Sequence, residues 1–167
     1  MKKALGYTLL ELVIVVALVG IVFSIAIPSM RVFTQNDRLV TNINLMVGHL
    51  AYARSEAVKR SQQVSVCVSN DSASCTGGDW EDGWIIYIDA DGDSAFSGGE
   101  EILRVQQALG GNNTVTTTLG NQVTYDYRGF TNAAGTMLLC DDRSGDFGKT
   151  LTITNTGRVR TSRDSTC

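Results

Sequence analysis

The spacing of apolar residues divides the chain into two parts of different character. The first part is a dense apolar block in which no charged residue occurs between Leu12 and Ile27. Counted from Tyr7, this block is about twenty residues long, which is enough for a helix to cross a bilayer. Pro28 follows it, and a proline at this point can kink or locally melt a helix because it removes a backbone donor.

A helical pattern resumes after the proline, since apolar residues recur mainly on one face of the predicted helix. They are Leu39, Ile43, Met46, Val47, Leu50, Ala51, Ala57 and Val58. Charged residues decorate the other faces: Asp37, Arg38, Arg54, Glu56, Lys59 and Arg60. We therefore expect the second half of the helix to pack its apolar stripe onto a head formed by the rest of the chain.

From about Gln63 the period changes to two, which is typical of β-strands. Predicted strands cover residues 64–68, 84–88, 101–105, 115–119, 123–127, 136–140 and 151–154. Gly, Asn and Asp residues separate them, so short turns and an antiparallel sheet are expected. One long helix followed only by strands predicts an α+β fold, in which the N-terminal helix packs on an antiparallel β-sheet head.

Four cysteines occur in the predicted head: Cys67, Cys75, Cys140 and Cys167. An even number behind an apolar export segment indicates two disulfides formed in an oxidising compartment. A zinc site is disfavoured because there is no Cys-x-x-Cys pair and His49 is the single histidine. Of the three possible pairings, we expect Cys67–Cys75 and Cys140–Cys167, since both can close within the head and the second would fix the C-terminus.

Composition narrows the function classes further. The formal net charge is −3, so the head would need a local basic patch to bind nucleic acid. With one histidine, no free cysteine to pair with it and no phosphate-binding loop, the sequence offers no catalytic constellation and no cofactor site. We expect a protein that is not an enzyme.

The segment from Asp89 to Glu100 mimics a calcium-binding loop, because Asp91 and Asp93 follow Asp89 at the spacing of an EF-hand. Ser94 stands where that loop requires glycine, and a strand rather than a helix is predicted before it. We therefore interpret the segment as an Asp/Gly turn and assign no metal site, while the three aspartates and Glu100 leave a calcium site as the alternative.

The N-terminus begins with Lys2 and Lys3, which favour a cytoplasmic location for the residues before the apolar block. An ordinary secretory signal does not fit, because the apolar run is too long and no small-x-small cleavage site follows it. Glu11 is unusual, since a carboxylate near the start of a membrane helix is costly unless it is paired. Cleavage after Gly6 would resolve this, because the new terminal ammonium group of the same or a neighbouring subunit would pair with Glu11.

This N-terminus resembles that of type IV pilins and type II secretion pseudopilins, which have a short basic leader ending in glycine, an aromatic residue and Thr-Leu-x-Glu. The matching residues are Lys2, Lys3, Gly6, Tyr7, Thr8, Leu9 and Glu11. The resemblance implies that a prepilin peptidase cleaves between Gly6 and Tyr7 and methylates Tyr7, where phenylalanine is more usual. It also implies that Glu11 serves assembly with other pilins.

The same resemblance implies a domain organisation and a location. Residues 1–6 would be the leader, 7–28 the transmembrane and assembly half of the helix, and 29–167 a periplasmic head, together forming the lollipop shape of a type IV pilin. The chain would span the inner membrane once before assembly and would then enter a pilus fibre at the cell surface.

A narrower resemblance covers most of the chain. Its segments are Ala53 to Arg60, the Val-x-Val-Cys strand that ends at Cys67, the block from Trp80 to Asp89, and Glu101 to Arg104. Together they are similar to the GspH/FimT/FimU family of minor pilins and minor pseudopilins. The resemblance implies a low-abundance subunit that lies at or near a fibre tip, primes assembly or gives the fibre a binding function.

Gly157, Arg158 and Arg160 near the C-terminus resemble the Gly-Arg-x-Arg motif of FimT-type pilins, which implies binding of double-stranded DNA. Gly157 permits a turn with positive φ, and arginines two residues apart point the same way on an extended segment. Such guanidinium groups grip phosphates. Lys149 and Arg163 would extend the patch, Arg143 could join it, and no acidic residue occurs from 149 to 163.

Four charges predict weak, salt-sensitive and sequence-independent binding. No aromatic residue lies between the arginines, so base stacking is not indicated. Three functions remain open: a minor pilin that captures DNA for natural transformation, a FimU-like subunit that primes pilus assembly, and a GspH-like pseudopilin of a type II secretion system. In the last two, the arginines would be a solvated hairpin end or contacts to a neighbouring subunit.

Overall fold

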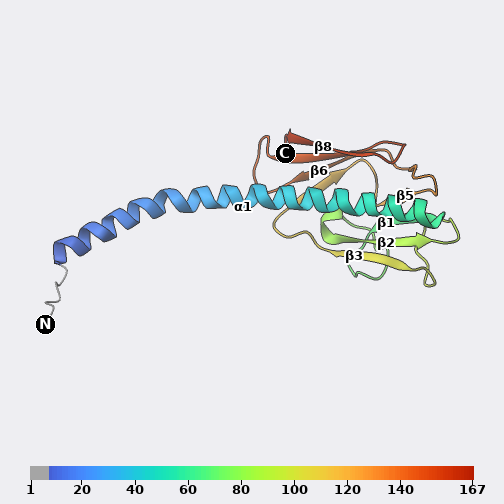
Figure 1. The fold of residues 1–167 in the computed structure, drawn as a ribbon, viewed down its shortest axis with the longest axis horizontal. Coiled ribbons are helices and arrows are strands. Elements are labelled where there is room, and N and C mark those ends of the chain that lie inside the picture. The colour runs from blue at the N-terminus through green and yellow to red at the C-terminus, as the bar shows by residue number, and fades with distance from the viewer. Residues whose placement is uncertain (1–7) are drawn as a thin grey trace. The chain divides into compact units, whose positions relative to one another are not determined.

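The computed structural model describes residues 8–167 and divides into two compact units, one ending at Asp37 and a head from Arg38 to Cys167. One helix, α1 (Leu9–Arg60), runs through both and continues unbroken past Pro28, so the proline does not melt it (Figure 1). Among the described residues, α1 is the one helix long and apolar enough to cross a membrane. Its apolar side chains before Asp37 are exposed to solvent.

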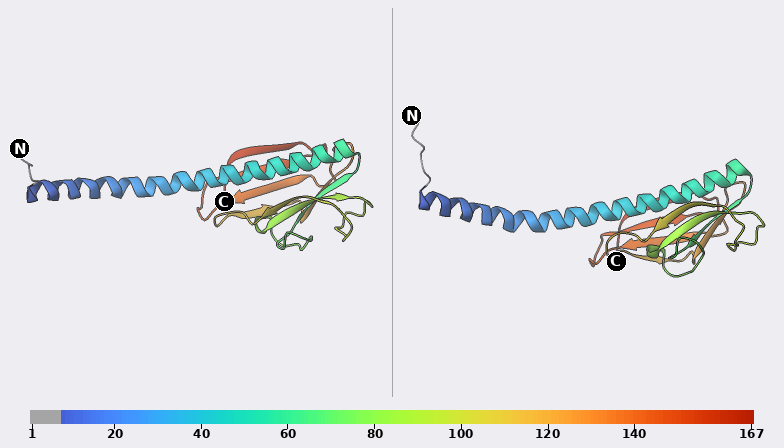
Figure 2. Two further views of the ribbon diagram at one scale, coloured as in Figure 1. Left: turned by 60° about the horizontal axis from the view of Figure 1, so that its bottom comes forward. Right: turned by 90° about the horizontal axis from the view of Figure 1, so that it is seen from below.

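The head contains two antiparallel sheets of four strands each, and the second half of α1 lies along them (Figures 1 and 2). The first has the order β3-β2-β1-β5 and consists of β1 (Gln63–Val68), β2 (Gly83–Asp89), β3 (Ile102–Gln107) and β5 (Gln122–Tyr125). The second has the order β4-β6-β7-β8 and consists of β4 (Thr114–Thr117), β6 (Gly135–Cys140), β7 (Gly148–Ile153) and β8 (Val159–Ser165). A short 3₁₀ helix, η1 (Trp80–Asp82), precedes β2. The predicted α+β class with a helix on antiparallel sheet is confirmed, although the strands form two sheets.

A single core joins the helix to both sheets. The helix buries Leu39, Ile43, Met46, Leu50, Ala53 and Ala57, which follow the three-and-four spacing of one helical face. Strand residues facing them include Val66 and Ile86 from the first sheet and Leu139 and Leu151 from the second. All members of this core lie between Leu39 and Ile153, so a fragment of residues 29–167 retains the complete core and both disulfides.

The predicted apolar stripe was too wide. Val47 is only half-buried, while Ala51 and Val58 are exposed, because they lie round the helix from the face that contacts the sheets. Conversely, Glu56 was expected on a solvated face but is buried. It forms ion pairs with Lys59 at 3.3 Å and with Arg60 at 2.7 Å, and the hydrogen bond from Arg60 lowers its pKa.

The last strand was not predicted from the sequence. Residues 159–165 are mostly polar, as is common for a strand at the edge of a sheet, and β8 exists because its backbone pairs with β7. Strand bounds also differ elsewhere, most clearly in β5, which ends at Tyr125. The carboxylate of Asp126 accepts the N–H groups of Arg128 and Phe130 at 2.9 Å each, which turns the chain away from the sheet.

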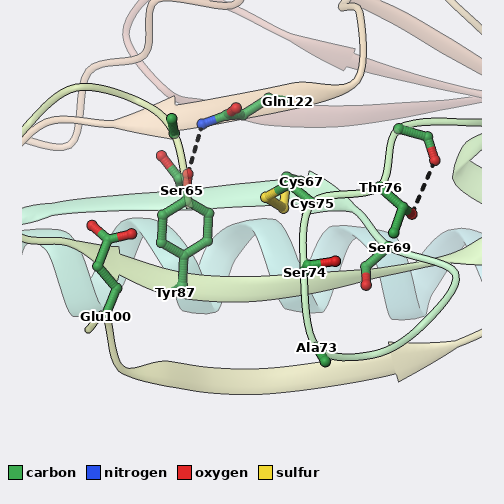
Figure 3. Close-up of a disulfide and its surroundings, with 12 residues drawn as sticks. Ser65, Cys67, Ser69, Ala73, Ser74, Cys75, Thr76, Tyr87, Glu100 and Gln122 are labelled. Carbon is green, nitrogen blue, oxygen red and sulfur yellow. Dashed lines mark hydrogen bonds between the residues drawn. A yellow bond between two sulfur atoms is a disulfide. The ribbon is translucent and has the colours of Figure 1, made fainter. Parts of the chain in front are cut away.

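Both disulfides have the expected pairing. Cys67–Cys75 holds the loop after β1 against the outer face of the first sheet, where Tyr87 is also buried (Figure 3). In the same view the amide of Gln122 donates to the Tyr87 hydroxyl at 3.0 Å. Cys140–Cys167 ties the last residue of the chain to the end of β6, with the two Cα atoms 5.8 Å apart.

Candidate nucleic-acid interface

The Gly-Arg-x-Arg segment begins in a tight connection between β7 and β8, here called the β7–β8 turn (residues 154–158). The N–H of Gly157 donates to the Thr154 carbonyl at 2.8 Å, and the N–H of Thr154 donates to the Arg158 carbonyl at 3.0 Å. Gly157 has φ 72°, which an L-residue adopts only with strain. The predicted positive φ at this glycine is therefore present.

Arg54 of α1 fixes this turn against a second loop. Its Nε donates to the Gly129 carbonyl at 2.9 Å, and its Nη2 donates to the Thr156 carbonyl at 3.0 Å. A Cβ atom at Gly157 would collide with the Gly129 carbonyl oxygen and would lie 3.0 Å from Arg54 Nε. Sequence reasoning placed Arg54 on a solvated face and missed this role, because only the fold brings helix, loop and turn together.

The two central arginines are both exposed, but they occupy different elements. β8 begins at Val159, so Arg158 immediately precedes the strand, and its carbonyl accepts the N–H of Thr154 next to the pair Val159–Ile153. Arg160 is on β8 opposite Thr152, and the neighbouring positions Val159 and Thr161 lie opposite the buried core residues Ile153 and Leu151. Since side chains alternate along a strand, Arg160 points away from the core.

The other predicted basic residues are more dispersed. Arg163 is exposed further along β8. It lies three residues from Arg160, which corresponds to roughly 10 Å along a strand at about 3.3 Å per residue. Lys149 is half-buried and lies opposite buried Leu139 on β6, which places it on the other face of the sheet from Arg160. The exposed basic residues near the turn are therefore Arg158 and Arg160, while Arg163 lies where the pairing of β7 and β8 shifts register and Lys149 lies on the other face of the sheet from Arg160.

Arg143 does not extend this basic surface. Its guanidinium forms an ion pair with Asp141 at 2.6 Å and lies 4.2 Å from the ring centroid of Phe147. Its side chain is 14% exposed. Burial alone would raise the pKa of Asp141, but the hydrogen bonds from Arg143 lower it overall. Arg143 thus has a structural role at the end of β7 remote from the turn.

A groove opens beside Arg158, between the turn and the exposed side of α1. It has a volume of about 610 Å³. Its lining residues are Val47, Ala51, Arg54, Ser55, Val58, Lys59, Gly157, Arg158 and Val159. Val47, Ala51 and Val58, which lie outside the buried face of α1, therefore form the apolar floor of this groove. The cationic side chains of Arg54, Lys59 and Arg158 also line it.

The acidic loop after β2 gathers carboxylate oxygens of Asp89, Asp91 and Asp93 within 4.8 Å of one another. Asp89 accepts the N–H groups of Gly92 at 2.8 Å and Ser94 at 3.0 Å. Burial raises the pKa of Asp89. Because the loop's own N–H groups occupy these oxygens, the Asp/Gly turn predicted from the sequence accounts for the arrangement.

The N-terminal motif is described only in part. Gly6 and Tyr7, the predicted cleavage and methylation residues, lie outside the described residues. Glu11 is exposed in the first turns of α1, and its N–H donates to Thr8 Oγ1 at 3.2 Å. This bond helps to cap the helix, because the first N–H groups of a helix have no partner within it.

Comparisons with known proteins agree with this architecture. The model of the type II transport protein GspH matches residues 42–157, and that of the prokaryotic N-terminal methylation motif matches residues 1–27. No curated protein gives a significant match. The methylation motif implies processing by a prepilin peptidase, and with the apolar helix it fits an inner-membrane-anchored pilin with a periplasmic head.

Solved structures share the fold at low sequence identity. The type IV minor pilin FimU of Pseudomonas aeruginosa PAO1 superposes with a TM-score of 0.62 at 22% identity, over 79% of this chain and 93% of that one. The minor pseudopilin EpsH from the type 2 secretion system of Vibrio cholerae gives 0.55 at 13% identity, over 75% and 97%. Both are fibre subunits rather than enzymes. The GspH model spans more than half of the chain, and the chain therefore belongs to the GspH family of minor pilins and pseudopilins.

Proposed function

We propose that this protein is a minor type IV pilin whose head binds extracellular double-stranded DNA for uptake in natural transformation. The main support is the pair of exposed arginines, Arg158 and Arg160, next to a turn that Arg54 and Gly157 hold rigidly. Arg163 is a further exposed arginine of β8. A fixed backbone reduces the side-chain and loop ordering that binding would otherwise cost.

The chemistry supports contact with phosphates rather than bases. Guanidinium groups bind phosphate oxygens through charge-assisted hydrogen bonds, and the sequence from 149 to 163 contains no carboxylate to oppose them. Three exposed arginines would engage about three phosphates, so the logarithm of the affinity should fall with the logarithm of salt with a slope near −3. Gly157 positions Arg158, and Lys149 would strengthen the local field from the other face of the sheet.

We further propose how the N-terminus is used. The leader of residues 1–6 is removed between Gly6 and Tyr7, Tyr7 is methylated, and residues 7–28 anchor the subunit in the inner membrane before it enters the fibre. Glu11 then pairs with a terminal ammonium group during assembly with other pilins. The cost of placing an unpaired carboxylate in hydrocarbon supports this role.

One observation favours a second candidate function. The groove beside Arg158 has an apolar floor formed by Val47, Ala51 and Val58, and exposed apolar surface in this position suits contact with another subunit. In that case the protein would be a FimU-like priming subunit or a GspH-like pseudopilin of a type II secretion system. The arginines would then contact a neighbouring pilin.

DNA binding by the oxidised head, residues 29–167, separates the two candidates. We expect the wild-type head to bind a short duplex with an affinity that falls with salt, and Arg158→Gln/Arg160→Gln to abolish that binding. Arg104→Gln is the control for Arg160→Gln, because Arg104 is exposed on β3 of the other sheet. A folded head that binds no DNA at low salt would refute the proposal and favour the subunit contact.

A further inference from the structure

The loop that Arg54 ties to the β7–β8 turn carries two exposed aromatic residues, Tyr127 and Phe130. We propose that this aromatic loop (residues 126–130) stacks on unpaired bases, so that the preferred ligand is single-stranded DNA or a duplex end with unpaired nucleotides. The inference rests on the proposed function, because it assigns the phosphates of the same strand to Arg158 and Arg160.

The fold places the aromatic loop directly beside the basic turn. The N–H of Thr131 donates to the Asn155 carbonyl at 3.0 Å, and Arg54 joins Gly129 to Thr156. The absence of a side chain at Gly157 is what allows the Gly129 carbonyl to approach. Residues about thirty positions apart in sequence therefore form one continuous surface, which no pattern within either segment indicates.

Both rings are available and their backbone is already ordered. Tyr127 is 55% exposed and Phe130 is 48% exposed, so a ligand can reach both rings. Asp126 holds the loop by accepting the N–H groups of Arg128 and Phe130, and the N–H of Gly129 donates to the Asp126 carbonyl at 2.8 Å. These bonds lower the pKa of Asp126, although burial alone would raise it.

Arg128 supports the rings and does not serve as a phosphate contact. Its guanidinium lies 5.3 Å from the Tyr127 centroid and 5.6 Å from the Phe130 centroid, within the range of cation–π attraction. It also forms an ion pair with Asp126 at 3.0 Å, so part of its charge is offset within the loop. The loop thus presents flat apolar surface next to a separate cationic turn, the combination that single-strand binding proteins use.

A polar hollow beside Phe130 provides groups for the edge of a stacked base. Its volume is about 340 Å³, within the range of small-ligand sites. Gln63, Asn132 and Asp126 line it together with Phe130, and the amides offer both donors and acceptors. Gly92 and Ser94 of the acidic loop also line it, so the hollow suits the edge of a base rather than a phosphate. In an intact duplex the base faces are already stacked and cannot reach this surface.

The test compares affinities of the head for three DNAs at one salt concentration: a short oligothymidylate, a blunt duplex, and that duplex with an oligothymidylate overhang. Tyr127→Ala/Phe130→Ala removes both rings, which are exposed, so folding should survive. Phe147→Ala is the matched control. Phe147 is 39% exposed and packs on Arg143, at the other end of β7 from the turn.

We expect the wild-type head to bind the oligothymidylate and the overhang more tightly than the blunt duplex. The double variant should lose about 10-fold in affinity for the two DNAs with unpaired bases, which is within the range expected when stacking is removed. Its affinity for the blunt duplex should change little. Phe147→Ala should change none of the three affinities. A 4-thiothymidine placed in the overhang should form photocrosslinks at Tyr127 or Phe130.

The outcomes distinguish this inference from the function on which it rests. Equal binding of all three DNAs by wild type and by the double variant, with binding still lost in Arg158→Gln/Arg160→Gln, would overturn stacking and leave DNA capture intact. A head that binds none of the DNAs would overturn both. Reduced entry of the double variant into fibres with unchanged DNA affinity would show that the rings contact another pilin instead.

Discussion

Replacing Gly157 by alanine tests the close packing that positions the arginines. The substitution has two costs in the free energy of unfolding. The first is the left-handed backbone at φ 72°, which costs an L-residue about 1–2 kcal/mol. The second is the collision of the new Cβ with the Gly129 carbonyl, which forces that loop or the turn to move.

The second cost follows from the bonds that such movement would break. Arg54 donates to the Gly129 and Thr156 carbonyls, and each bond contributes about 1 kcal/mol in this partly exposed setting. We therefore expect Gly157→Ala to lower the free energy of unfolding of the head by about 3–4 kcal/mol. Urea denaturation of the oxidised fragment, residues 29–167, measures this value.

Gly120→Ala separates the two costs. Gly120 has nearly the same φ, 71°, but a Cβ there would meet nothing within 4 Å, so only the backbone cost of about 1–2 kcal/mol should remain. Arg54→Ala completes the test, because Arg54→Ala/Gly157→Ala should cost about 2 kcal/mol less than the sum of the single changes. If Gly157→Ala proved no more destabilising than Gly120→Ala, the contact between turn and loop would not have the importance argued above.

Four further predictions concern other parts of the molecule. Tyr125→Phe should leave stability unchanged or raise it by about 1 kcal/mol in urea denaturation, because the buried Tyr125 hydroxyl has no hydrogen-bond partner among residues 8–167; a loss of several kcal/mol would show an overlooked partner. Replacing Cys140 and Cys167 by serine should cost about 3.5 kcal/mol for a closed loop of 27 residues, also by urea denaturation, and an unchanged midpoint would contradict this. Burial lowers the pKa of His49, and the charge of Arg104 lowers it further. As the pH falls, the imidazole is therefore protonated in the unfolded chain before it is protonated in the folded head. The free energy of unfolding should decrease below about pH 6.5, by at most about 1.4 kcal/mol per pH unit. This decline should be smaller in His49→Gln over the same pH range. Glu11→Ala should leave leader removal intact on immunoblots yet deplete the subunit from sheared fibres, and normal fibre content would refute the pairing of Glu11.

Much of the architecture was predictable because it depends on periodicity within short segments. The shift from a helical period to a period of two was expected from about Gln63, and in the structure α1 ends at Arg60 and β1 begins at Gln63. The predicted strands 64–68 and 84–88 match β1 and β2 closely, although both strands are buried on both faces. Strand β8 escaped detection because its polar residues have no apolar alternation and its backbone is ordered by pairing with β7.

The sequence by itself determined the apolar N-terminal helix, the α+β class and the basic segment near the C-terminus, since each follows from local pattern, spacing or the composition of one segment. It favoured one of three possible cysteine pairings, and the structure has that pairing. Only the tertiary structure decided that Arg54 reaches the β7–β8 turn, that Glu56 is buried with its cations, and that Val47, Ala51 and Val58 line a groove. It also brought the loop that carries Tyr127 and Phe130 next to the β7–β8 turn. Such relations join residues that are distant along the chain, and they arise from the packing of two sheets on one helix, a geometry that no single segment encodes.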